Sequence, residues 1–178
     1  PLKRTVMWAQ MGDWPFYGAT YSAANPPRAT PIRYYVRDEG TDEHDFSVEI
    51  TDSSGATVRT FDGPAEPGVN EILWNWRHDA PYETRAGEGG GGRGRGSGTP
   101  QGPIVMPGQY TVTLHVGEDD FSSTVEIQAD PRRSMTMADR RARQDALMSL
   151  NHLAAPLFEA TQAAQRLTDQ MEEAESLL

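Results

Sequence analysis

The stretch FSVEITDSSGATVRTF, residues 46–61, decides the fold class of this chain. Apolar and polar residues alternate before and after its centre, which is the period of a half-buried β-strand. Between the two alternating runs, Asp52-Ser53-Ser54-Gly55 has the composition of a tight turn. The stretch therefore predicts a β-hairpin with one apolar face. Because a lone hairpin is not stable in water, the rest of the chain must supply a layer that covers this face.

Further strands follow the same alternating pattern. We expect one strand at residues 32–36 (IRYYV) and another at 71–77 (EILWNWR), with Trp74 at the centre of the core. Residues 110–127 alternate on both sides of Gly117, so they predict a second hairpin. Its apolar face is expected to lie on that of the first hairpin, as in a sandwich of two antiparallel sheets.

The composition divides the chain into three parts. Residues 1–28, rich in proline and aromatic residues, are expected to form an extended N-terminal arm, and residues 29–133 the β-sandwich. Inside the sandwich, the Gly/Arg-rich segment 83–102 is predicted to be a flexible loop, because residues 87–98 contain eight glycines. Residues 134–178 are predicted to be a helical tail, kinked or broken near Pro156.

The tail carries an apolar stripe. Apolar and small residues recur at intervals of three and four, which predicts one continuous helical face. It is formed by Leu147, Leu150, Ala154, Leu157, Thr161, Ala164, Leu167, Met171, Ala174 and Leu178. A stripe of this length needs a partner: the flank of the sandwich, a helix elsewhere in a longer protein, or another chain, including a second copy. The residues predicted to interact are Leu147, Leu150, Leu157, Ala164, Leu167 and Met171.

Composition and motifs argue against several functions. The net charge of −10 disfavours a nucleic-acid partner, even though the loop contains a Gly-Arg-Gly-Arg-Gly run. The chain has no cysteine and no apolar run long enough for membrane insertion. We find no serine-nucleophile elbow, no paired zinc-ligand spacing and no calcium-loop spacing in the acidic stretch 38–45. The sequence therefore predicts no catalytic, cofactor or metal residues, and a protein that is not an enzyme.

The aromatic residues of the arm leave one binding function open. Trp8, Trp14, Phe16 and Tyr17 could stack on sugar rings, with Trp14, Phe16 and Tyr17 as the principal candidates, which would make the chain a carbohydrate-binding module. The alternative is that they cover an edge or face of the sheet. A glycosidase is a further alternative, since among 26 acidic residues some pair of carboxylates could meet.

The order of the strand and turn motifs resembles that of a known family. These motifs are Asn25-Pro26-Pro27, VEITDSSGATVR at 48–59, GVNEILWNWR at 68–77, PGQYTVTL at 107–114 and Asp130-Pro131-Arg132. Together they resemble the immunoglobulin-like domain, similar to that of the flagellar hook-capping protein FlgD, at the C-terminal end of bacterial sortilin-like or BNR-repeat β-propeller proteins often labelled glycosyl hydrolases. The Asp-box motif of propeller blades does not occur in this sequence, so the glycosyl hydrolase label should not be transferred to it.

The resemblance implies a fold, a role and a location. The fold is mainly β: an Ig-like antiparallel β-sandwich with an extended N-terminal arm and a C-terminal helical appendage. The role is that of a non-catalytic accessory or interaction module that docks through its helical tail and sheet face. Its partner is the β-propeller remainder of a larger chain or another protein, at an extracellular, periplasmic or cell-surface location. Because the sequence begins with Pro1-Leu2-Lys3, we expect a processed product or a piece of a longer protein; a secretion-sorting domain is a lesser alternative.

Overall fold

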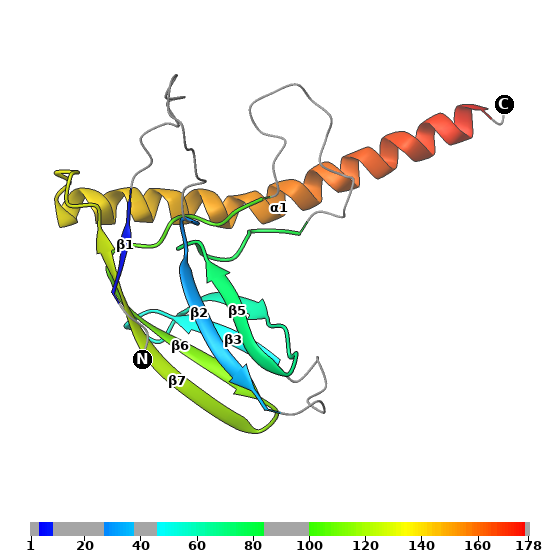
Figure 1. The fold of residues 1–178 in the computed structure, drawn as a ribbon. Coiled ribbons are helices and arrows are strands. Elements are labelled where there is room, and N and C mark those ends of the chain that lie inside the picture. The colour runs from blue at the N-terminus through cyan, green and yellow to red at the C-terminus, as the bar shows by residue number, and fades with distance from the viewer. Residues whose placement is uncertain (1–3, 9–26, 38–45, 84–99, 177–178) are drawn as a thin grey trace, which may run out of the picture. The chain divides into compact units, whose positions relative to one another are not determined.

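The computed structural model describes residues 4–8, 27–37, 46–83 and 100–176, and within them the fold is mainly β with one C-terminal helix (Figure 1). The chain divides into two compact units. Residues 1–77 and 105–136 form the first, which contains all the described strands, and residues 78–104 and 137–178 form the second, which contains the helix.

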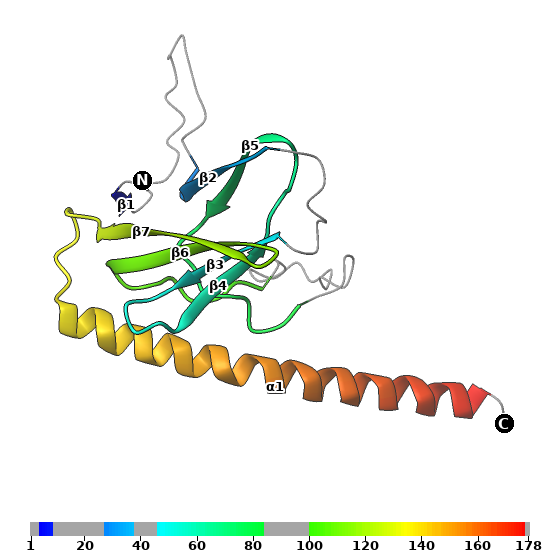
Figure 2. The same cartoon turned by 90° about the horizontal axis from the view of Figure 1, so that it is seen from below.

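The first unit contains two sheets. The larger is a curled, mixed sheet in the order β1-β7-β6-β3-β4, and the smaller pairs β2 with β5 (Figure 2). The strand bounds are β1 Thr5–Met7, β2 Thr30–Val36, β3 Phe46–Thr51, β4 Thr57–Asp62, β5 Gly68–Trp74, β6 Gly108–Val116 and β7 Asp119–Ala129.

The predicted first hairpin is confirmed as β3 and β4. Its turn is held by Asp52, whose Oδ1 accepts hydrogen bonds from the backbone N–H groups of Ser54 and Ala56 at 2.8 and 3.0 Å. Gly55 adopts φ +85°, a left-handed conformation that residues with a Cβ rarely take. The turn predicted at residues 52–55 is therefore confirmed.

The predicted stacking of the two hairpins is wrong. β3 pairs antiparallel with β6, with Val48 opposite Leu114, so the two hairpins lie side by side in one sheet instead of face to face. Both apolar faces consequently lie on the same side of that sheet. The facing layer comes from β2 and β5, which pair with Ile32 opposite Ile72.

The core forms between the two sheets, and Trp74 is its largest fully buried side chain, as the sequence predicted. The Trp74 ring meets Tyr110 edge to face, with centroids 5.3 Å apart. The strand predicted to run to Arg77 ends at Trp74, because Trp76 takes φ +58° and turns the chain. The Trp76 indole N–H, itself buried, donates to the Thr30 hydroxyl at 2.9 Å, which fixes this turn against β2.

Part of the predicted N-terminal arm belongs to the larger sheet. Thr5–Met7 form β1, which pairs parallel with β7. Parallel strands need a long crossover, and here almost the whole first unit separates the two in sequence. Of the remaining arm, residues 1–3 and 9–26 lie outside the described residues.

The second unit is built on helix α1, Met137–Ser176, which runs without a break through Pro156. Of the two alternatives predicted for the tail, a pair of helices is therefore excluded, and Figure 1 shows the axis of the single helix changing direction near its middle. No described helix is long and apolar enough to cross a lipid bilayer. The segments that flank residues 84–99 meet in this unit, where the His78 N–H donates to the Pro103 carbonyl at 2.9 Å.

Candidate functional site

Helix α1 carries a strict heptad pattern of apolar residues. From Ala146 to Ala174, nine apolar residues are spaced alternately four and three positions apart. This is the spacing of the a and d positions of a coiled coil. We call these nine residues the seam: Ala146, Leu150, Leu153, Leu157, Ala160, Ala164, Leu167, Met171 and Ala174.

Every residue of the seam is exposed. The four leucines are 61–69% exposed and Met171 is 65% exposed, although such side chains usually lie in a core. No side chain of the described helix is fully buried. The burial of a leucine stabilises a protein by roughly 1.5–3 kcal/mol, so the exposed seam leaves a large apolar contribution unused among the described residues of the second unit.

The opposite face of the helix is the one that contacts its own unit. At about 100° per residue, the half-buried positions cluster roughly 150° from the centre of the seam. On that face the Phe158 ring stacks on Tyr82, with centroids 4.1 Å apart and planes 7° apart, and Gln144 Nε2 lies 3.1 Å from His78 Nε2. The helix thus has one face that holds the segment around residues 78–82 and a separate face that is apolar and exposed.

The seam differs from the stripe predicted from the sequence. Leu150, Leu157, Ala164, Leu167 and Met171 lie on it, whereas Leu147 is half-buried and lies outside it. Ala146, Leu153 and Ala160 belong to the seam and were missed by the sequence prediction. Counting steps of four and three from Ala146 finds all nine positions. The predicted stripe instead moved to the neighbouring positions Ala154 and Thr161.

The three aromatic residues predicted to stack on sugars, Trp14, Phe16 and Tyr17, lie outside the described residues. Trp8 is half exposed, and the Arg132 guanidinium lies 5.1 Å from the centre of its ring. A cation over the ring face is a stabilising arrangement, and it occupies a surface that a sugar would need.

The first unit contains a groove of about 580 Å³ between its two sheets. Ile32 and Tyr34 of β2 lie on one side of it, and Leu114 and Phe121 of the larger sheet on the other. The titratable side chains among its lining residues are Arg33, which pairs with Glu71 at 2.6 Å, and Tyr34, whose hydroxyl donates to the Pro64 carbonyl at 2.8 Å. The other polar side chains that line it carry hydroxyls, so no carboxylate lines the groove.

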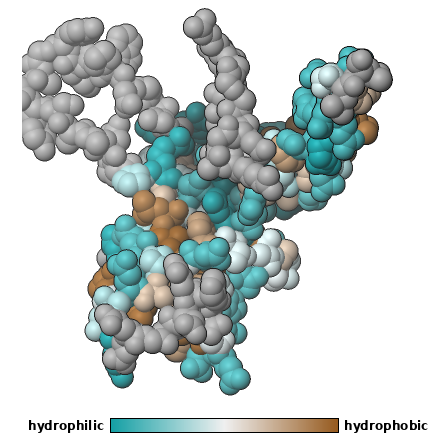
Figure 3. All heavy atoms as spheres, turned by 90° about the vertical axis from the view of Figure 1, so that its right-hand side faces the viewer, coloured by the Kyte–Doolittle hydropathy of each residue, from teal (hydrophilic) through white to brown (hydrophobic). Residues whose placement is uncertain are grey.

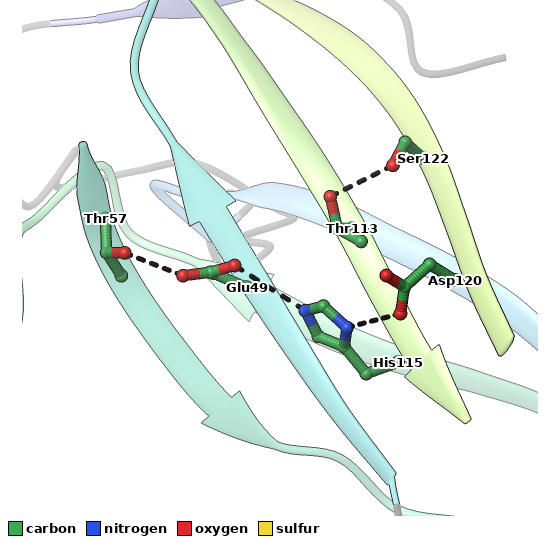
Figure 4. A network of polar contacts seen from close by, with 6 residues as sticks. All are labelled: Glu49, Thr57, Thr113, His115, Asp120 and Ser122. Atoms are coloured by element: carbon green, nitrogen blue, oxygen red, sulfur yellow. Dashed lines mark hydrogen bonds and ion pairs between the residues drawn. The ribbon is translucent and has the colours of Figure 1, made fainter. Parts of the chain in front are cut away.

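A polar network crosses the outer face of the larger sheet (Figure 4). His115 Nδ1 lies 2.6 Å from Asp120 Oδ1, and His115 Nε2 lies 3.6 Å from Glu49 Oε2. The Thr57 hydroxyl donates to the other Glu49 oxygen at 2.6 Å. The hydroxyl therefore contacts a carboxylate and not the imidazole, which is not the order that activates a nucleophile.

The same network is not arranged as a metal site. The His115 ring lies between the two carboxylates, so the three side chains do not converge on one point. Across the described residues, no three His, Cys, Asp or Glu side chains are placed to hold a metal ion. The network links strands β4, β3, β6 and β7 through polar cross-strand pairs, which stabilise a sheet.

Comparisons with protein families, with curated proteins and with solved structures give no match to this chain.

Proposed function

We propose that this chain is a non-catalytic interaction module that docks onto a partner helix through the seam of α1. The observation that carries this proposal is the exposure of nine consecutive a and d positions on one helix. Surface helices of globular proteins place such positions against a core. A seam with a period of 3.5 residues is buried most completely by another helix, because supercoiling keeps the two seams in contact.

The seam of the helix is a better docking surface than the outer face of the larger sheet. The outer face of the larger sheet is occupied by polar residues that pair with one another, among them His115 and Glu49. Docking there would remove these groups from water for little apolar gain. Figure 3, in which the C-terminal part of the helix comes toward the viewer, shows some brown, hydrophobic atoms among the teal ones on that segment.

We further propose an Ig-like β-sandwich for the first unit and an extracellular, periplasmic or cell-surface location. The two sheets with one shared core support the sandwich, and β2 with β5 supply its second layer. The location, and the attachment to a β-propeller in a longer bacterial protein, rest on the resemblance of the strand motifs alone.

The experiment that tests the docking function uses the protein in the cells that produce it. Leu157→Glu and Leu167→Glu together place two charges on the seam, whereas His152→Glu and Gln165→Glu add the same charge at exposed positions away from it. The size of the native assembly that contains the protein would be measured on native gels after gentle lysis. We expect the seam variant alone to move to a smaller assembly. An unchanged assembly in the seam variant would contradict the proposed function.

A further inference from the structure

The charges of helix α1 are distributed unevenly along its length. Its first turns contain Arg140, Arg141 and Arg143 beside two aspartates, whereas after Arg166 every charged residue is acidic. These acidic residues are Asp169, Glu172, Glu173 and Glu175. The helix is therefore basic near one end of the seam and strongly acidic near the other.

Side-chain size on the seam is uneven as well. Leu150, Leu153 and Leu157 are large, and the next two positions, Ala160 and Ala164, are small. In a parallel pair each position faces its own copy, so alanine would face alanine at two successive layers and leave the helices poorly packed. An antiparallel pair instead places a positions opposite d positions and can set large residues against small ones.

We propose that the seam binds the seam of a second copy of this chain, with the two helices antiparallel. This inference rests on the proposed docking function and names the partner. A two-fold axis between Phe158 and Glu159 places Leu157 opposite Ala160 of the second copy and Leu153 opposite Ala164. In the same register Leu150 faces Leu167, and Ala146 faces Met171.

This register also brings the unlike charges together. At each end of the pair, Arg140 of one helix and Glu175 of the other lie at e positions, which flank the seam and meet in this register. Opposite charges that flank a helical seam select partner and orientation. A parallel pair would set arginines beside arginines and glutamates beside glutamates, which suppresses that arrangement. Between these ends, the e and g positions that flank the seam, from Leu147 to Gln170, are all uncharged. No like charges there oppose the pairing.

The test combines solution mass with crosslinking of the purified full chain. Light scattering at increasing concentration is expected to give twice the mass of the chain for the natural sequence and for Gln165→Glu, and the mass of one chain for Leu157→Glu. A single-chain mass for the natural sequence at all concentrations would overturn self-pairing. The docking function would still stand if the cellular assembly depended on the seam.

Orientation is tested with single cysteines, which are unambiguous because the chain has none. In the proposed pair Leu150 faces Leu167, and the two Leu150 residues are about 25 Å apart along the axis. A short bismaleimide should therefore link Leu150→Cys to Leu167→Cys when the two variants are mixed, and should not link Leu150→Cys to itself. Self-linkage of Leu150→Cys would overturn the antiparallel arrangement.

Charge reversal distinguishes a lost contact from a folding defect, because a second reversal on the other side of the contact should restore association. Arg140→Glu is expected to weaken association several-fold, because it sets two acidic residues beside each other at both ends of the pair, and adding Glu175→Arg is expected to restore it. In a parallel pair the first variant would replace one like-charge contact by another. Equal association of all three proteins would therefore contradict the antiparallel assignment.

Discussion

The rings of Tyr82 and Phe158 lie face to face, with their centroids 4.1 Å apart, and this contact joins the segment that precedes the Gly/Arg-rich residues to the middle of helix α1. The two residues are far apart in sequence, and the stack lies on the helix face opposite the seam. Because the seam, which we propose binds a partner, and this internal contact occupy different faces of the helix, substitutions can affect one without the other.

Phe158→Ala is expected to release the segment around residues 78–83 from the helix. An aromatic pair contributes about 0.5–1.5 kcal/mol beyond the area it buries, so local opening should become several-fold more frequent. Hydrogen exchange of the amides in that segment is expected to speed up. The exposed neighbour Glu159→Ala is the matched control and should leave exchange unchanged. Equal exchange in both variants would show that the stack does not hold the segment.

Gly102 and Gly108 should respond differently to alanine. A Cβ at Gly102 would overlap the backbone carbonyls of His78 and Asp79, whereas a Cβ at Gly108 would meet nothing within 4 Å. We expect Gly102→Ala to lower the free energy of unfolding by about 1–3 kcal/mol, because backbone atoms must move, and Gly108→Ala to change it by less than about 0.5 kcal/mol. Urea denaturation measures both. Equal effects would mean that residues 78–79 and 102 do not approach each other so closely.

The stability of the first unit should fall at alkaline pH through Tyr110. Burial, with a smaller contribution from the negative charge of Asp52, raises the pKa of Tyr110 to about 12. Because the unfolded chain releases this proton near pH 10, stability is fully present below pH 10 and is lost as the pH rises toward 12, by about 2–3 kcal/mol. Urea denaturation between pH 8 and pH 12 checks this expectation.

Tyr110→Phe is the control for that pH dependence. It removes the titrating group and also the hydrogen bond that the hydroxyl donates to the Met106 carbonyl at 2.6 Å, so we expect a loss of about 1 kcal/mol at neutral pH. The slope above pH 10 should become smaller without vanishing, because burial also raises the pKa of Tyr34. An unchanged slope would assign the alkaline loss to other groups.

The first hairpin turn should depend on the side-chain oxygen of Asp52. Asp52→Ala leaves the N–H groups of Ser54 and Ala56 without their acceptor and is expected to cost about 1 kcal/mol. Asp52→Asn keeps an acceptor oxygen and should cost less, although it should also lower the pKa of Tyr110 by removing a negative charge. Thermal unfolding beside the exposed control Ser53→Ala measures the turn contribution. If Asp52→Ala matched that control, the turn would not need the side chain.

Local elements of this fold could be predicted from the sequence because local chemistry determines them. Alternation and turn residues identified both hairpins, and the burial of Trp74 followed from its place in an apolar strand. The pairing of β3 with β6 could not be predicted in the same way. Two hairpins with apolar faces show the same alternation whether they lie in one sheet or in two facing sheets, so the pattern does not distinguish these arrangements.

The candidate site could likewise be predicted only in part from the sequence. The predicted stripe includes six of the nine residues of the seam, namely Leu150, Leu157, Ala164, Leu167, Met171 and Ala174. It missed Ala146, Leu153 and Ala160, because periods of 3.5 and 3.6 residues diverge by about 20° in each heptad and the prediction did not separate them. The contact of Tyr82 with Phe158 joins distant parts of the sequence, and no local pattern indicates it.

The pairing of β1 with β7 affects how the protein can be made. Thr5 pairs with Ile127, so β1 has no partner in this sheet until β7, about 120 residues further along the chain, has been synthesised. At translation rates of about 5–20 residues per second, this delay lasts roughly 6–24 seconds. The larger sheet can therefore be completed only late in synthesis, and until then a nascent chain exposes an unpaired strand that chaperones could bind.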